Sequence, residues 1–162
     1  MRRARQTTAP EVARRLELDV SYASRSPWVP STRLLNQWAE AALVPVGGPH
    51  VLSVRIVGKA RSRSLNSRYR HKHKPTNVLS FAGAGTAPDG RSFLGELVIC
   101  APLVALEARA QDKTLQAHWA HLTIHGVLHL LGFDHERPRE ARKMAAREIQ
   151  ILDRLGFSNP YR

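Results

Sequence analysis

Alternating apolar and polar residues predict four strands, most of them in the first half of the chain. Residues 16–22 (LELDVSY) alternate regularly, which indicates a half-buried strand because successive strand side chains point to opposite faces. Three further runs rich in Val, Ile, Leu and Phe predict the other strands, at 51–57, 77–81 and 94–100. Residues 83–92 contain several glycines and are expected to form a loop.

Apolar residues spaced three or four apart predict helices, which dominate the second half of the chain. They are expected at residues 31–44, 60–69, 102–111, 115–131 and 139–155. Ser31 is a suitable N-cap, Pro102 suits a first helical turn, and Gly132 suits a helix end. Early strands followed by helices, without repeats or a linker, predict a single α+β domain with one sheet and about five helices.

Four histidines lie along one side of the helix predicted at 115–131. At about 100° per residue, they share an arc of about 80° beside a separate apolar arc that can pack into the core. These residues are His118, His121, His125 and His129. His125 and His129 lie on adjacent turns, which is the spacing that two imidazoles need to bind one metal ion at about 2.0–2.1 Å.

A third metal ligand is predicted just after this helix. The segment 125–135 reads HGVLHLLGFDH, in which Gly132 lets the chain turn back toward the helix before His135. Three neutral imidazoles favour zinc or a similar borderline metal and leave a fourth position for water, as in catalytic zinc sites. We therefore expect one zinc ion per chain on His125, His129 and His135, at the end of the long helix. A cluster of surface histidines and a purely structural zinc are the alternatives, although a structural zinc usually has four protein ligands.

Gly126 separates this motif from the metalloproteases that share its histidine spacing. Those enzymes have the pattern HExxHxxGxxH, in which the glutamate is the base that activates water. Here Gly126 occupies the position of that glutamate, which argues against peptide hydrolysis. A glycine within a helix costs about 1 kcal/mol relative to alanine, so we expect a reason of packing or of access for it.

The chain carries a large positive charge, with 25 Lys and Arg against 13 Asp and Glu and a net charge of +12. This excess attracts polyanions, so nucleic acid, an anionic membrane surface and an acidic protein are candidate partners, with nucleic acid favoured. Cations and histidines alternate within residues 68–74, and an arginine beside a metal can clamp a phosphodiester. The alternative for this basic segment is a solvated run of charges on a loop.

Composition also bears on location. The single cysteine, Cys100, excludes an internal disulfide and favours a reducing compartment. The sequence has no run of 18 apolar residues, so no membrane-spanning segment is expected. Residues 1–14 are basic and have no apolar stretch, so we expect a flexible basic arm rather than a secretory signal, with part of an organelle transit peptide as the alternative.

Three segments resemble the YbeY family of rRNA maturation factors. The first is HGVLHLLGFDH at 125–135, preceded by AHWAH at 117–121, and the second is YRHKHKPTNVLSF at 69–81. The third is GELVIC at 95–100, and the resemblance as a whole covers roughly residues 50–157.

This resemblance implies a metal-dependent endoribonuclease for single-stranded RNA, in an α+β domain (15–162) built on a small mixed sheet. Such proteins act in 16S rRNA 3′-end maturation and ribosome quality control. The small ribosomal subunit and its assembly factors are therefore the implied partners, and the cytoplasm is the implied location. The resemblance also places zinc on the three histidines of the motif, and it matches the family's functional arginine to Arg70.

The chain departs from the family pattern at several places. An acidic stretch is common where this chain has Gly58-Lys59, and Asp is common where it has Glu96. Residues 71–73 are more basic than usual, and the arm at 1–14 is additional. These differences concern contacts with substrate rather than the metal site.

Further residues are candidates for roles around the metal. Those that can act as a general base, orient a ligand or contact RNA are His118, His121, Asp134 and Lys74. Tyr69 and Phe133 are candidates for stacking on unpaired bases, with a place in the core as the alternative. Two other functions stay open: an RNA-binding ribosome-assembly factor with a structural zinc and, less favoured, a metallopeptidase.

Glu148 lies within the apolar stripe of the helix predicted at 139–155. A carboxylate on a packed face needs a partner, because burying an unpaired charge is costly. The pattern predicts that Glu148 bonds a histidine or an arginine from elsewhere in the chain and so orients a residue of the site. The alternative, which the rarity of fully buried acids favours, is that Glu148 reaches solvent at the edge of the stripe.

Overall fold

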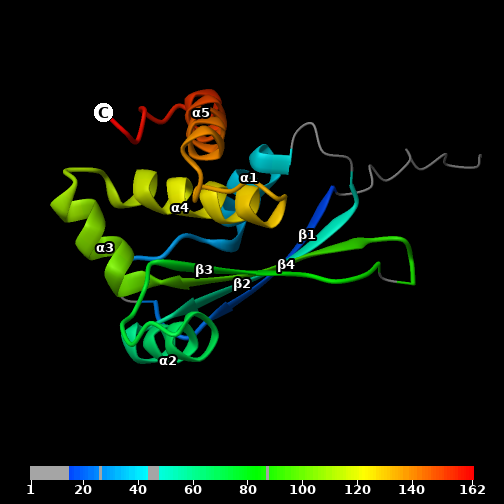
Figure 1. Ribbon diagram of the computed structural model, residues 1–162, viewed down its shortest axis with the longest axis horizontal. Helices are drawn as coiled ribbons and strands as arrows, with labels where there is room; N and C mark the ends of the chain where they lie inside the picture. Colours follow the sequence, from blue (N-terminus) through cyan, green and yellow to red (C-terminus); the bar gives the residue numbers. More distant parts are fainter. Residues whose placement is uncertain (1–14, 26, 44–47, 87) are drawn as a thin grey trace, which may run out of the picture.

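A four-stranded sheet forms the central layer of the protein (Figure 1). The computed structural model describes residues 15–25, 27–43, 48–86 and 88–162. The strands are β1 (Leu16–Tyr22), β2 (His50–Val57), β3 (Val78–Ala82) and β4 (Ser92–Cys100). Their order across the sheet is β1-β2-β4-β3, with β1, β2 and β4 parallel and β3 antiparallel to β4. The expected small mixed sheet is therefore confirmed.

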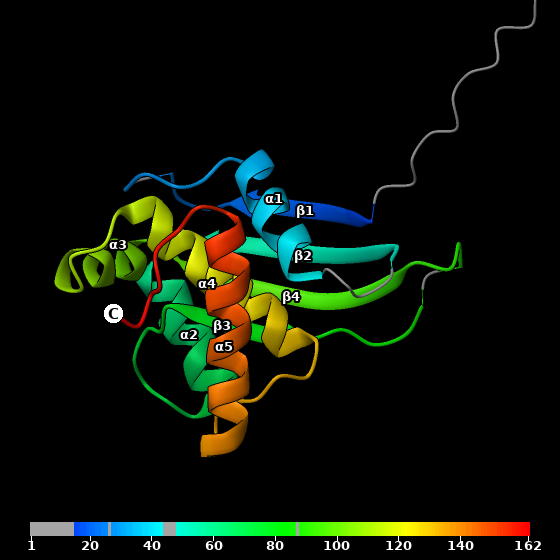
Figure 2. The same ribbon diagram turned by 90° about the horizontal axis from the view of Figure 1, so that it is seen from above.

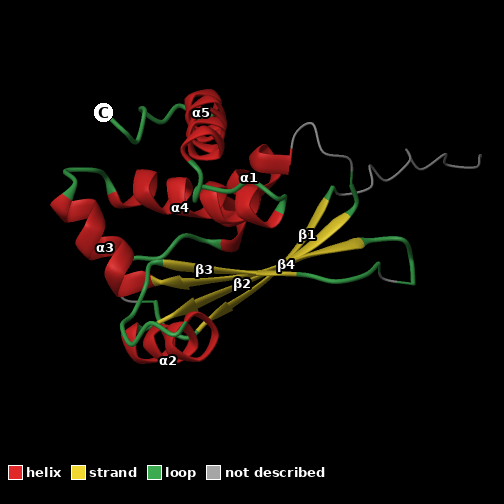
Figure 3. Ribbon diagram, in the orientation of Figure 1, coloured by secondary structure: helices red, strands yellow, loops and turns green. Residues whose placement is uncertain are grey.

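Helices cover both faces of this sheet (Figure 3). They are α1 (Thr32–Leu43), α2 (Lys59–Arg70), α3 (Ala101–Ala110), α4 (Leu115–Leu130) and α5 (Pro138–Arg154). Helix α2 lies alone on one face, whereas α1 and α4 cover the other face. Helix α5 lies outside α4 and crosses it, as Figure 2 shows from above. The predicted α+β fold is confirmed for the described residues, and the largest boundary error is at β4, which begins at Ser92 rather than at Leu94.

The main core lies between the sheet and helices α1, α4 and α5. Leu52, Val54 and Ile56 of β2 are fully buried, as expected for a central strand of a covered parallel sheet. Trp38 of α1 and Ile124 of α4 belong to the same cluster. A smaller cluster lies on the side of α2 and consists of Val57, Leu65, Leu79 and Val98. Helix α4 is therefore anchored by its apolar side.

Local interactions set the ends of the helices. The Ser31 hydroxyl accepts a hydrogen bond from the Leu34 N–H at 3.3 Å, which confirms its N-cap role. The Thr114 hydroxyl caps α4 in the same way, at 3.1 Å. After α4, Gly132 has a φ of 99°, a left-handed conformation that glycine adopts without strain. This turn redirects the chain, so that His135 returns beside the helix.

Gly126 lies where α4 packs most closely on the sheet. A Cβ atom at this position would lie 2.8 Å from the Leu97 Cδ2 atom of β4. Leu97 is fully buried, so its side chain has little room to move away. Packing, one of the two reasons expected from the sequence, therefore explains a glycine in the middle of this helix. The same contact leaves no room for a glutamate at the position that metalloproteases use.

The predicted basic arm at 1–14 lies outside the described residues. Among the residues that are described, none of the helices is long and apolar enough to cross a membrane.

We predict that Gly126→Val lowers the free energy of unfolding by about 1–3 kcal/mol, because added methyl groups overpack the contact with Leu97. Intrinsic helix propensity alone would change stability in the opposite direction, since valine is the better helix former. Gln116→Val, at an exposed position of the same helix, is the matched control and should change stability little. Urea unfolding of both variants measures the difference. Equal stability of the two variants would contradict the packing explanation.

Candidate functional site

Three histidine rings gather at the C-terminal end of α4. His125 and His129 come from the helix, and His135 comes from the loop that follows it. The ring centroids are 5.8 Å apart for His125 and His129, 5.6 Å for His125 and His135, and 4.9 Å for His129 and His135. Three imidazoles around one tetrahedral ion place their ring centres about 5 Å apart. The separations of the ring centres are close to this value.

The nitrogen atoms of these rings do not form a complete set of metal ligands in the described residues. Across residues 15–25, 27–43, 48–86 and 88–162, no group of three or more His, Cys, Asp or Glu side chains is arranged so that it could hold a metal ion. The three histidines are thus brought together as predicted, while their binding of zinc stays a prediction.

Hydrogen bonds fix the protonation of two of these rings. The Nδ1 atom of His129 lies 2.7 Å from the backbone oxygen of Phe133, which can only accept, so Nδ1 carries the proton. The Nδ1 atom of His125 lies 2.6 Å from Oε1 of Glu148 and donates to this carboxylate. In both neutral rings the lone pair is then on Nε2, the state in which histidine binds a metal. The donor chemistry of these residues therefore fits zinc.

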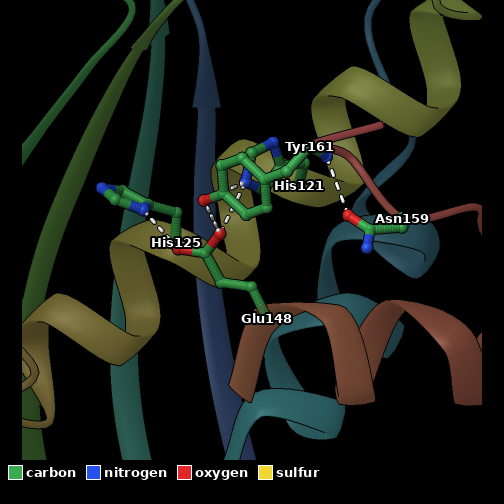
Figure 4. Close-up of polar contacts among 5 residues, drawn as sticks. All are labelled: His121, His125, Glu148, Asn159 and Tyr161. Atoms are coloured by element: carbon green, nitrogen blue, oxygen red, sulfur yellow. Dashed lines mark hydrogen bonds and ion pairs between the residues drawn. The ribbon is translucent and has the colours of Figure 1, made fainter. Parts of the chain in front are cut away.

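Glu148 is the buried centre of a polar network between α4, α5 and the segment after α5 (Figure 4). Its relative exposure is 0%. Besides His125, its carboxylate accepts hydrogen bonds at Oε2 from His121 Nε2, at 2.7 Å, and from the Tyr161 hydroxyl, at 2.5 Å. The prediction that Glu148 bonds a histidine is confirmed, and the alternative that it reaches solvent is wrong. The reason is that three donors compensate the burial of one charge.

This network shifts the pKa values of both acidic groups in it. Burial raises the pKa of Glu148, but hydrogen bonds from His121, His125 and Tyr161 outweigh burial and lower the pKa to about 2. Burial and the hydrogen bond to Glu148 raise the pKa of Tyr161. At neutral pH, Glu148 is therefore an ionised acceptor and Tyr161 a neutral donor.

Arg70 and the histidine cluster line one cleft of about 670 Å³, although they lie far apart in the sequence. Arg70 is the last residue of α2, and its Nη2 donates to the Ser80 backbone oxygen of β3 at 3.0 Å. Its guanidinium also lies over the Phe81 ring, 5.6 Å from the ring centroid. Lys74 lines the same cleft, and its backbone oxygen accepts from the Asn66 side chain at 2.8 Å. A phosphodiester in this cleft would meet both cations and imidazoles.

The other predicted residues divide into two groups. His118 and His121 line the cleft. Asp134, Tyr69 and Phe133 do not belong to its lining. The Asp134 carboxylate accepts from the backbone N–H of Glu136 at 3.0 Å, so it stabilises the loop before His135. Tyr69 packs edge-on against Phe81, and Phe133 packs against the main core, so neither faces the cleft as a stacking platform.

Sequence reasoning missed several residues of the cleft. Tyr161 carried no signal, because its contact with Glu148 depends on how the chain returns after α5. Asn77 and Glu107 also line the cleft, and the Asn77 amide donates to the Glu107 carboxylate at 3.1 Å. A polar residue on the short helix α3 is indistinguishable in sequence from a solvated one.

The chain is similar to proteins of one family over most of its length. A family model described as Endoribonuclease YbeY matches residues 30–156. Proteins described as Endoribonuclease YbeY from two strains of Coxiella burnetii are each 46% identical over 149 residues, covering 90% of this chain and 98% of the relative. A solution structure of a target protein from Thermotoga maritima matches with a TM-score of 0.54 at 22% identity, covering 86% of this chain and 92% of that chain. At such an identity, the last match supports the fold alone.

We predict that Glu148→Leu lowers the free energy of unfolding of the metal-free protein by about 3 kcal/mol, because three buried donors lose their acceptor. The ¹⁵N signals of the His125 ring should also move toward a mixture of tautomers, since the partner that fixes its Nδ1 proton is gone. The His129 ring should keep its tautomer, because Phe133 still accepts from it.

Glu140→Leu is the matched control for this change. Glu140 lies on the same helix, and its ion pair with Lys143, at 3.5 Å, is solvent-exposed and contributes little. If the His125 tautomer is unchanged in Glu148→Leu, the carboxylate does not orient that ring.

Proposed function

The chain belongs to the Endoribonuclease YbeY family, and on this premise we propose that it is a zinc-dependent endoribonuclease that cleaves single-stranded RNA. One observation carries the proposal: a single cleft is lined by Arg70 and by three histidines whose ring centres lie 4.9 to 5.8 Å apart. A phosphodiester needs a cation for its charge and an activated water for its hydrolysis. The residues of this cleft are suited to provide both.

His125, His129 and His135 are the proposed zinc ligands, with one ion per chain. A zinc ion held there would supply a Lewis acid for activating water and for withdrawing charge from a phosphoryl oxygen. The carboxylate of Glu148 and the Phe133 carbonyl hold the rings of His125 and His129 with Nε2 free to bind the ion.

Arg70 is the proposed catalytic residue that contacts the scissile phosphate. Its guanidinium can form two parallel hydrogen bonds with phosphate oxygens and neutralise charge that develops during cleavage. The hydrogen bond to Ser80 and the contact with Phe81 restrict the side chain, so that less conformational freedom is lost on binding. Lys72 and Lys74 lie in the same lining and would hold the RNA backbone.

We propose rRNA as the natural substrate, with a role in 16S rRNA 3′-end maturation and ribosome quality control in the cytoplasm. The small ribosomal subunit and its assembly factors are the proposed partners. Family membership supports this role, and the net charge of +12 favours association with a large RNA.

We predict that the purified protein binds about one zinc ion per chain, as measured by mass spectrometry of the metal content. His125→Ala or His129→Ala should remove most of it, because two imidazoles bind zinc much more weakly than three. His73→Ala is the control, since His73 is exposed and bonds Ser67. If both His125→Ala and His129→Ala retain full zinc, the ligand assignment is wrong.

We predict that protein purified to homogeneity cleaves a short unpaired RNA, and that His129→Ala abolishes cleavage while RNA binding persists. Arg70→Ala should lower kcat by about 10²- to 10³-fold, because an electrostatic contact to the reacting phosphate is lost. Arg63→Ala is the control, since Arg63 is an exposed arginine of the same helix outside the cleft. Binding without any cleavage by the wild-type protein would instead support an assembly factor with a structural zinc.

A further inference from the structure

The cleft has a second end, which is distant from the three histidines. Glu107 of α3, the following Gln111 and Lys113, and His118 near the start of α4 contribute to its lining. His118 lies seven residues before His125 and eleven before His129 on the same helix, so it is separated from these two by about 10 Å and about 16 Å along the helix axis. An RNA strand lying along α4 with its scissile phosphate at the histidine cluster would therefore place a nucleotide a few positions away at this far end.

The far end contains buried polar atoms that have no hydrogen-bond partner among the described residues. His118 is 3% exposed, and neither of its ring nitrogens has a hydrogen-bond partner. Oε1 of Glu107 is also buried without such a partner, and it lies 3.6 Å from His118 Nε2, a distance that allows an ion pair when His118 is protonated but is too long for a hydrogen bond. The other carboxylate oxygen, Oε2, is fixed by the Asn77 amide. Buried polar groups of this kind normally bind a complementary partner.

The groups at this end carry both charges and offer both donors and acceptors. Burial raises the pKa of Glu107, but hydrogen bonding and charge from His118, Asn77 and Lys113 lower it by more than burial raises it, so its carboxylate is ionised at neutral pH. This carboxylate accepts hydrogen bonds from the N–H groups of a nucleobase, and the ammonium of Lys113 donates to its carbonyl or ring-nitrogen acceptors. His118 in its neutral form offers one donor and one acceptor, and the Gln111 amide offers both as well. Mixed donors and acceptors match the edge of a base.

We propose that the far end of the cleft, formed by Glu107, Gln111, Lys113 and His118, is a subsite for one unpaired nucleobase of the RNA substrate. This proposal rests on the proposed function and adds a reason why the endoribonuclease would prefer single-stranded RNA. The hydrogen-bonding edge of a base is occupied within a duplex, so only an unpaired base can present it to Glu107 and His118.

The test uses the zinc-loaded wild-type protein and a short unpaired RNA that it cleaves at one position. The base is removed from one nucleotide at a time on both sides of the cleavage position, leaving the sugar and the phosphate. At one position a few nucleotides away, loss of the base should raise KM about tenfold with little change in kcat, because one or two hydrogen bonds are lost.

Two variants connect that position to the subsite. In Glu107→Gln the intact RNA should already have a raised KM, and removal of the same base should have little further effect. Gln111→Ala, at an exposed position, provides the same comparison without risk to folding. Glu140→Gln is the control and should show the full wild-type response to base removal. If Glu107 had only a structural role, Glu107→Gln would not abolish the effect on KM of removing one particular base.

The outcomes separate this proposal from the proposed function. If the wild-type protein cleaves the RNA but no base removal raises KM, the subsite is overturned and the proposed function stands. If neutralising a single phosphate linkage, rather than removing a base, produces the effect, the far end binds the backbone and the proposal is wrong. If the wild-type protein cleaves no unpaired RNA, the proposed function itself fails, and the subsite fails with it.

Discussion

The buried carboxylate of Glu148 constrains how helix α5 lies on helix α4. A charge with no exposed surface is tolerated only where donors surround it, and the observed orientation of α5 meets this requirement by placing Glu148 against His121 and His125. The same orientation positions the chain after α5, so that the Tyr161 hydroxyl reaches the carboxylate. One ionised group thus sets the packing of a helix, the return of the following segment and the orientation of a histidine in the cleft.

The elements of this fold could be predicted from the sequence because their signals are local. Apolar and polar residues alternate along the whole of β1, at 16–22, and the turn after α4 is predicted by Gly132 alone. Helical periodicity places the Glu148 side chain on the packed face of α5 and predicts a histidine or an arginine as its partner, but the rarity of buried acids favours an exposed position instead, and only the structure decides between the two. The existence of a histidine cluster followed from spacing in the same way, since His125 and His129 share a helix and the turn lies just beyond it.

Other features depend on contacts between distant segments, and no local pattern reports them. The reason for Gly126 is the position of Leu97 on β4, which is set by the depth at which α4 packs on the sheet. The pairing of Asn77 with Glu107 joins the residue before β3 to helix α3. Arg70 was predicted as a site residue only from the resemblance to a family, because nothing in the basic segment itself indicates which cation shares a cleft with the histidines. Charge density identifies a segment, whereas tertiary packing selects the residue within it.

Net charge and cleft chemistry answer different questions about the substrate. The charge of +12 attracts any polyanion, and attraction alone does not favour single strands over the more densely charged duplexes or one position of a strand over another. That distinction requires groups that bind the base edges that are occupied in a duplex. An acidic side chain within a strongly basic protein is suited to this task, because the Glu107 carboxylate accepts hydrogen bonds that a base can donate and a phosphate diester cannot. The opposite ends of the cleft would then hold a strand by different parts, by its phosphate at Arg70 and by its base near His118.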